Sequence, residues 1–349
     1  MRLYAGLLLV LCMGARAQDG LTTYGVLDVF ATRLKADGLP ATTRIDSSGL
    51  LASRVGVRGA HELGDGLRSN FVIEIGLNQD DGGAPDGNRL ANRQAWVGLT
   101  GRYGELRLGR QNTPQFYMNG KYDAFTSATQ ASGWNNLFGA PPRTDNAIAL
   151  ISPLMAGVRV QALLARGATG GAAPALETAN NQNLHFALEY ERGPLYVGAN
   201  HQVVKANSAV TSVRRSSMGA SYAVSSRWSA FGAAGVEQRP DGTQSTRLVS
   251  LSARYQLLPA TSLAFGWAGL QDRLAGPGHG DAREVSAMLR HVLSKRTSIY
   301  SALSHLSQEG QRNSFFLGGS AVVTPAAQIR SPLPGGDISG LQLGLLYSF

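Results

Sequence analysis

The stretch that decides the fold runs from Ile338 to Phe349 and reads ISGLQLGLLYSF. Apolar side chains occupy every second position of its later part, at Leu341, Leu343, Leu345, Tyr347 and Phe349. Because side chains alternate between the two sides of a strand, the stretch predicts a strand with one apolar face. A closed barrel in a membrane pairs every strand and turns such a face towards lipid. The alternative is an ordinary amphipathic strand in a soluble β-sandwich.

The same period-two alternation recurs in segments of about ten residues along the whole chain. It predicts sixteen strands, near residues 22–31, 53–62, 67–78, 90–100, 104–111, 145–152, 157–166, 182–191, 194–204, 213–224, 227–237, 244–256, 261–272, 282–293, 297–307 and 338–349. Short connections such as 63–66 alternate strictly with long ones such as 35–49, 112–144 and 308–337. This alternation is typical of an up-and-down transmembrane barrel, and a β-sandwich does not require it. The sequence therefore predicts an all-β fold, a sixteen-stranded antiparallel transmembrane β-barrel.

The segment from Leu67 to Asn78 indicates the environment of the inner face of the barrel. Phe71, Ile73 and Ile75 share one face, whereas Arg68 and Glu74 share the other. Unpaired charges are costly in a dry core, so the charged face is expected to line water.

The N-terminus differs from the rest of the chain. Arg2, the apolar run Leu7–Met13 and the small residues Ala15 and Ala17 are typical of a secretory signal peptide. We expect residues 1–17 to be this signal peptide and residues 18–349 to form the barrel domain. The single cysteine, Cys12, lies within the signal peptide, so the mature barrel is expected to hold no disulfide.

Several short motifs lie in order across the mature chain. They are YGVLD at 24–28, SRVGVRG at 53–59, NRQAWVGL at 92–99, GRQ at 109–111, LSKRT at 293–297 and the terminal Phe349. Together they resemble the general porins of Gram-negative outer membranes, in the branch shared by β-proteobacterial and neisserial porins. The resemblance implies a homotrimer in outer-membrane lipid that passes small hydrophilic solutes and inorganic ions by passive diffusion. It also implies that the outer-membrane assembly machinery recognises Phe349. One departure is Asn112, which stands where an aromatic residue is common.

In porins that this chain resembles, the loop after the fifth predicted strand folds into the barrel and narrows it. The matching segment, 112–144, is rich in aromatic residues that could anchor it, and a lid folded on the surface is the alternative. Related anion-preferring porins carry arginines at the motif positions of Arg54, Arg93 and Arg143. We therefore expect a pore constriction and a weak preference for anions. The candidate constriction residues are Arg54, Arg58, Arg68, Arg93, Arg143, Lys121, Asp123 and Glu74.

Other functions have weaker support. Each wall arginine could instead be neutralised by Glu74, Asp28 or Glu105. The alternatives to a general pore are a substrate-specific uptake channel and, as an enzyme, a barrel lipid hydrolase. The six histidines are dispersed, and no Gly-x-Ser-x-Gly motif or metal-ligand spacing occurs. We expect no enzymatic activity, no catalytic residues, no metal and no cofactor. The net charge of +9 comes from scattered arginines, so we expect no nucleic-acid partner.

Overall fold

The computed structural model describes residues 20–85, 89–126, 129–138, 142–166, 182–205, 212–318 and 329–349. The predicted signal peptide, residues 1–17, lies outside the described residues. None of the helices in these ranges is long and apolar enough to cross a membrane.

Strands make up most of the described chain. They are β1 (Thr22–Ala36), β2 (Thr42–Ser47), β3 (Arg54–Gly64), β4 (Leu67–Gly76), β5 (Gln94–Gly101), β6 (Gly104–Asn112), β7 (Arg143–Ile151), β8 (Val158–Arg166), β9 (Gln182–Arg192), β10 (Leu195–Lys205), β11 (Val213–Ala223), β12 (Trp228–Gln238), β13 (Ser245–Leu258), β14 (Thr261–Asp272), β15 (Ala282–Val292), β16 (Thr297–Gln308) and β17 (Ile338–Ser348). Two short helices, α1 (Pro114–Asn119) and α2 (Gly133–Leu137), lie between β6 and β7.

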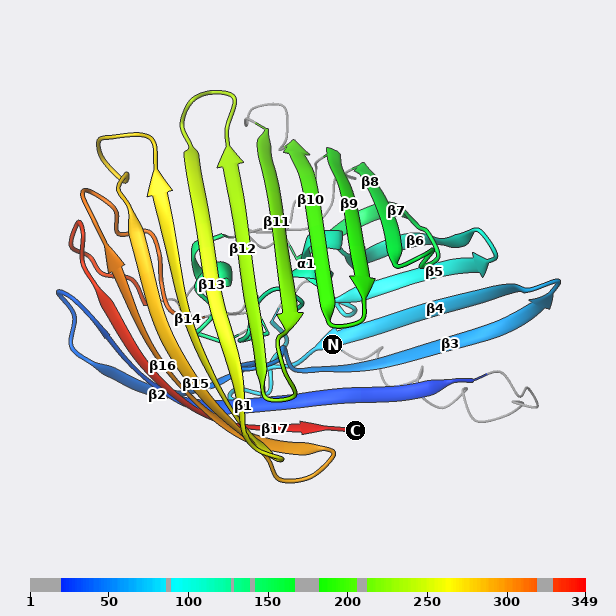
Figure 1. The fold of residues 1–349 in the computed structure, drawn as a ribbon, viewed down its shortest axis with the longest axis horizontal. Helices are drawn as coiled ribbons and strands as arrows, with labels where there is room; N and C mark the ends of the chain where they lie inside the picture. The colour runs from blue at the N-terminus through cyan, green and yellow to red at the C-terminus, as the bar shows by residue number, and fades with distance from the viewer. Residues whose placement is uncertain are drawn as a thin grey trace, which may run out of the picture.

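The sheet closes on itself. Successive strands pair antiparallel around the molecule, and β17 pairs with β1, with Ser348 opposite Val26 and Ile338 opposite Ala36. Figure 1 shows the two strands side by side although they lie at opposite ends of the chain. One half of β1 pairs with β2 and the other half with β3. Together β2 and β3 fill one position, so the barrel has the sixteen positions that the alternation predicts.

The prediction of a long connection at residues 35–49 is wrong in its length. β1 continues to Ala36, and the six residues of β2 return along it. Six residues are too few for a clear alternation signal, so the sequence does not reveal this strand. Residues 48–53, between β2 and β3, are not part of the sheet. The carboxylate of Asp28 accepts hydrogen bonds that a neighbouring strand would otherwise accept. It accepts hydrogen bonds from the backbone N–H of Leu50 (2.6 Å) and Leu51 (2.7 Å) and from the Tyr300 hydroxyl (2.7 Å).

The two faces of the wall differ as the alternation predicts. On β17, Leu343 is 53 % exposed on the outside, whereas its neighbour Gln342 points inward and is 1 % exposed. Apolar side chains are exposed at alternate positions on many other strands, including Ile73, Leu150, Phe186, Leu251, Phe265 and Leu303. The outer face is therefore an apolar belt suited to lipid, and the inner face carries the polar side chains.

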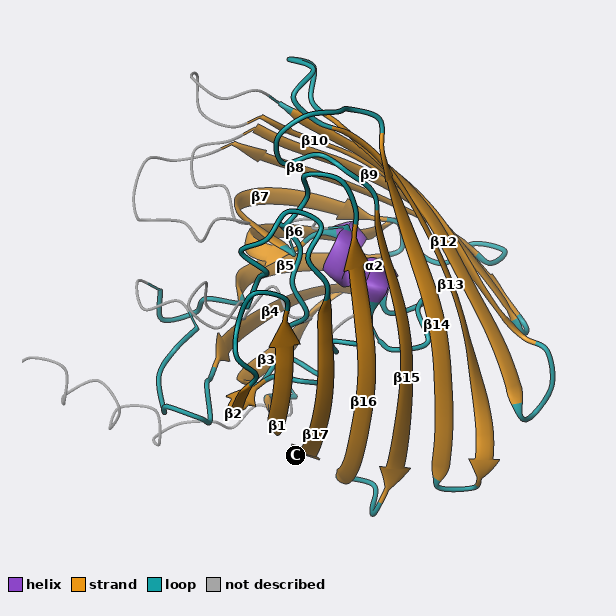
Figure 2. Cartoon of the chain, turned by 90° about the vertical axis from the view of Figure 1, so that its left-hand side faces the viewer, coloured by secondary structure: helices purple, strands orange, loops and turns teal. Residues whose placement is uncertain are grey.

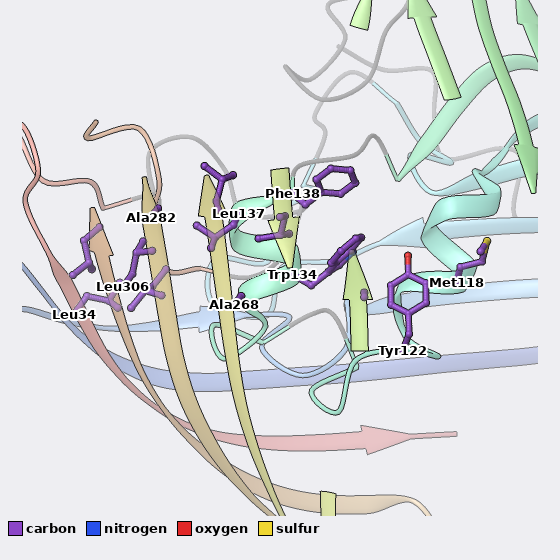
Figure 3. Packing of buried hydrophobic residues seen from close by; sticks show 14 of the residues in the cluster. Leu34, Met118, Tyr122, Trp134, Leu137, Phe138, Ala268, Ala282 and Leu306 are labelled. Atoms are coloured by element: carbon purple, nitrogen blue, oxygen red, sulfur yellow. The ribbon is translucent and has the colours of Figure 1, made fainter. Parts of the chain in front are cut away.

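The segment between β6 and β7, residues 113–142, is the inner loop. Its described residues, 113–126, 129–138 and 142, lie inside the barrel, as Figure 2 shows for α2, so the prediction of an inward-folded loop is confirmed and the surface lid is wrong. α1 contacts β8, β9 and β10, whereas α2 contacts β13, β14 and β15. The apolar cluster that results joins loop side chains such as Met118, Tyr122 and Trp134 to wall residues such as Ala268 and Leu306 (Figure 3).

Candidate pore constriction

Glycines on the inner face of the wall provide the space for the large side chains of the inner loop. A Cβ atom on Gly219 of β11 would lie 2.3 Å from Tyr122, and one on Gly266 of β14 would lie 2.4 Å from Phe125. Such distances are far shorter than van der Waals contact, so any larger residue would push the loop away. Met118 packs against Gly198 of β10, where a Cβ atom would lie 2.6 Å from the Met118 methyl carbon. The position of the loop is thus set by where the wall lacks side chains.

A network of hydrogen bonds fixes α1 and links it to α2. Asn119 Oδ1 accepts hydrogen bonds from the Tyr122 hydroxyl (2.9 Å) and from Trp134 Nε1 (3.0 Å). Gln115 donates to the Tyr122 oxygen (2.5 Å) and accepts from the Ser217 hydroxyl on β11 (2.6 Å). Burial raises the pKa of the Tyr122 phenol far above its ordinary value, so the group remains a neutral donor.

Residues in the middle of the loop, between α1 and α2, reach the side of the barrel away from the strands that α1 contacts. Gln130 Nε2 donates to the carbonyl of Ala302 (3.2 Å), and Ser304 Oγ donates to the carbonyl of Gln130 (3.0 Å). Thr126 Oγ1 donates to the carbonyl of Leu50 at the β2–β3 break (3.4 Å). The described part of the loop therefore contacts the inner wall from β8 round to β1, and Tyr117 also reaches β5, where its hydroxyl donates to Gln94 Oε1 (3.3 Å).

Glu74 is the centre of a charged cluster on the inner wall of β3 and β4. Arg93 Nε donates to Glu74 Oε1 at 2.7 Å, and Arg54 Nε lies 3.3 Å from Glu74 Oε2. The Tyr24 hydroxyl donates to the same Oε2 at 3.0 Å. Two guanidinium groups thus share one carboxylate, which leaves one net positive charge in the cluster. Arg54 is partly exposed, whereas Arg93 precedes β5 and is only 3 % exposed.

Arg58 and Arg68 lie on the same inner face, nearer the short turns. Both side chains are exposed, and within the described ranges neither has a carboxylate oxygen within 4 Å of its guanidinium. Arg58 stacks over the Tyr24 ring, with its guanidinium carbon 5.6 Å from the centroid. Within the described ranges, neither of these two arginines is held in a direct ion pair, so both guanidinium groups remain accessible from the lumen.

The remaining predicted constriction residues, Arg143, Asp123 and Lys121, are buried or held in an ion pair. Arg143 begins β7, is 4 % exposed and has its guanidinium carbon 5.6 Å from the Phe116 ring centroid. Asp123 is 2 % exposed and accepts a hydrogen bond from the Ser132 hydroxyl at 2.6 Å, so it holds the loop together. Lys121 is partly exposed and forms an ion pair with Glu189 at 2.6 Å. The structure thus gathers Arg54, Arg58, Arg93 and Glu74 on one stretch of wall and places the loop residues apart from them.

One charged residue of the inner wall, Arg107, is not among the candidates that the sequence predicts. Arg107 of β6 forms an ion pair with Glu105 at 2.7 Å and stacks over the Trp96 ring at 4.4 Å. Leu106 and Leu108 flank it, and their outward parity already places Arg107 inside. Arg110 binds Asp145 (2.5 Å) and the Asn92 carbonyl (2.9 Å) at the base of the loop. In the part of the chain that the structure describes, no group of three or more His, Cys, Asp or Glu residues is placed to hold a metal ion.

Comparison with known proteins gives a consistent result. A family model described as Gram-negative porin matches residues 5–311. The outer membrane porin protein 32 of Delftia acidovorans is 27 % identical, over 96 % of this chain and 95 % of that protein. The major outer membrane protein P.IB of Neisseria meningitidis serogroup B is 26 % identical, over 76 % of this chain and 80 % of that protein.

Solved structures share the fold. The structure described as an anion-selective porin from Comamonas acidovorans has a TM-score of 0.78 at 22 % identity and covers 95 % of this chain and 100 % of that one. OmpT, an outer membrane protein of Vibrio cholerae, has a TM-score of 0.67 at 13 % identity, over 95 % of this chain and 98 % of that one. Together with the closed barrel and its inner loop, these matches show that the chain belongs to the Gram-negative porin family and is an outer-membrane porin channel.

Proposed function

We propose that this porin is a passive pore for small hydrophilic solutes and ions, with a weak preference for anions. The observation that carries the proposal is that Arg54 and Arg93 share the single carboxylate of Glu74. Arg58 and Arg68 extend the same positive surface without a carboxylate within 4 Å in the described ranges. The charged wall therefore carries more positive than negative charge where the inner loop narrows the passage.

The physical basis is short-range electrostatics in a confined space. At physiological salt, charges are screened over about 8 Å, so an ion in a narrow passage still feels the wall. Arginine remains protonated even where several arginines crowd together, so this charge persists across the physiological pH range. Ion pairs such as Arg107–Glu105 and Lys121–Glu189 cancel much of the remaining charge, which is why we expect a weak preference.

Two assignments accompany this function. We propose that the chain assembles as a homotrimer, supported by its family and by the similar OmpT structure that is described as a trimer form. We also propose Arg54, Arg58, Arg68, Arg93 and Glu74 as the charged wall of the constriction, with Lys121 on the loop side. Arg143 and Asp123 would act from buried positions, by shaping the loop.

Purified protein in planar lipid bilayers tests the proposal. A general pore gives stepwise, ohmic current increments, and an anion-preferring one gives a reversal potential of the anionic sign in a KCl gradient. A specific uptake channel would be blocked by one class of nutrient, and a lipid hydrolase would release fatty acid from the bilayer without current steps. A reversal potential of the cationic sign would overturn the preference, and the absence of current steps would overturn the pore.

A further inference from the structure

A hollow of about 470 Å³ opens between α1 and the wall formed by β5–β9, towards the short turns of the barrel. Its lining includes Arg107, Tyr117, Lys121, Arg159, Gln161 and Glu189. The volume lies within the range of pockets that hold small organic molecules. The charged side chains around it come from the wall and from the loop together.

The Glu189 carboxylate already accepts three hydrogen bonds from neighbouring side chains. Their donors are Lys121 Nζ (2.6 Å), Gln161 Nε2 (2.6 Å) and the Tyr196 hydroxyl (3.0 Å). Arg159 lies directly opposite Glu189 in the β8–β9 register, which is the usual place for an ion pair. Because the other three donors hold the Glu189 oxygens, no ion pair forms between Arg159 and Glu189. Within the described ranges, no carboxylate lies within 4 Å of the Arg159 guanidinium.

The unpaired guanidinium of Arg159 indicates the class of solute. Arg107 pairs with Glu105, and Lys121 pairs with Glu189 (2.6 Å) and, more loosely, with the exposed Glu191 outside the lining (3.8 Å). Among the basic residues of the lining, Arg159 alone has no ion pair within the described ranges, so its guanidinium is open to a carboxylate. Arg107 Nε is also buried without a hydrogen-bond partner. A single carboxylate balances the charge of Arg159 and fits the fork of an arginine. A second carboxylate on the same solute would find no further unpaired basic side chain in the lining, and a cation would be repelled by the Arg159 guanidinium.

The remaining lining is suited to a flat apolar body. Tyr117 projects from α1 with 37 % of its surface exposed, and its hydroxyl donates to Gln94 at 3.3 Å, which fixes the ring. A planar ring beside it would gain stacking contact. We propose that this hollow is a binding subsite for a small organic monocarboxylate with a planar body, whose carboxylate lies on Arg159 and whose body lies against Tyr117. This inference rests on the proposed pore function, because solute reaches the hollow through the lumen.

Benzoate is the probe for this subsite, and its neutral isostere benzamide is the control ligand. In planar bilayers, added benzoate is expected to reduce the chloride current with a saturable concentration dependence, whereas benzamide has no such effect. In Arg159→Gln the half-blocking concentration should rise by roughly fivefold or more, because a charged hydrogen bond contributes more than about 1 kcal/mol. Arg227→Gln removes an exposed arginine from a short turn outside the hollow and should leave the block unchanged.

Two further variants keep the test decisive. Arg159→Lys retains the charge but loses the fork and should give an intermediate half-blocking concentration, and Tyr117→Leu should weaken the block without changing the reversal potential. An unchanged block in Arg159→Gln, or an equal effect of benzamide, would overturn the subsite. The reversal potential in KCl, measured on the same channels, reports the proposed ion preference separately. A cation-preferring wild-type channel whose benzoate block still depends on Arg159 would refute the preference and retain the subsite.

Discussion

The Tyr122 ring lies directly on the inner face of Gly219, so that a Cβ atom on the glycine would be 2.3 Å from the ring. This contact ties the inner loop to β11 and helps to set the width of the passage. Loop and wall are fitted to one another, because a large loop residue meets a wall position without a side chain. Gly266 and Phe125 form a second contact of this kind on β14.

Gly219→Ala should therefore push the loop into the lumen. The added methyl group overpacks a filled site, which typically costs about 1–3 kcal/mol, and the loop can yield only towards the open passage. We expect a lower single-channel conductance and a lower unfolding temperature. The matched control is Gly232→Ala on β12, where the new Cβ would meet only the flexible Leu251 side chain, at 3.3 Å, and the Ser250 carbonyl, at 3.7 Å. Wild-type conductance and stability in Gly219→Ala would contradict this role of the glycine.

Asp28 is expected to stabilise the break between β2 and β3. In Asp28→Asn, the amide retains one acceptor oxygen for the N–H groups of Leu50 and Leu51 and for the Tyr300 hydroxyl. Losing an acceptor in a buried site costs about 1–3 kcal/mol, so the temperature of heat unfolding in detergent should fall. Asp65→Asn, in an exposed turn with positive φ that asparagine also tolerates, is the control. Equal unfolding temperatures for the two variants would show that Asp28 does not have this role.

Phe349 offers a test of the proposed recognition by the assembly machinery. Its backbone N–H donates to the Gly25 carbonyl (3.1 Å) and its carbonyl accepts from the Gly25 N–H (3.0 Å), so both bonds survive truncation of the side chain. Phe349→Ala should therefore still refold in detergent, but should yield much less folded protein in the outer membrane of cells. Phe265→Ala, which removes another outward aromatic ring, should assemble normally. Similar cellular yields for the two variants would argue against recognition of Phe349.

The strand pattern of the barrel could be predicted from the sequence because burial alternates with the pleat. Ile73 and Glu74 face opposite sides in the structure as the alternation indicates, and the described part of the long 112–144 segment does enter the barrel. Strand β2 could not be predicted, because six residues carry too little periodicity and its pairing depends on the extended end of β1.

The constriction could be predicted only in part. Arg54, Arg58, Arg68 and Glu74 follow from the parity of β3 and β4. The burial of Asp123 and Arg143 depends on how the loop packs, which local sequence does not encode. For the same reason, the pairing of Lys121 with Glu189 brings together residues that lie far apart in the sequence. Whether the candidate residues set ion preference stays a prediction.

Arg54 is the arginine of the Glu74 cluster whose charge can be changed with the least disturbance, because it is partly exposed, whereas Arg93 is buried. Arg54→Gln leaves Glu74 paired with Arg93 alone and removes the net charge of the cluster, and Arg54→Glu makes the cluster negative. Arg239→Gln, which removes an exposed arginine outside the barrel strands, is the control.

The decisive measurement is the reversal potential of single channels in a KCl gradient, compared between the wild type, Arg54→Gln and Arg54→Glu. A charged wall that sets the preference predicts an anionic sign for the wild type, a smaller anionic potential for Arg54→Gln and a still larger shift in the cationic direction for Arg54→Glu. A cationic sign in the wild type, or three identical potentials, would contradict that account of the pore.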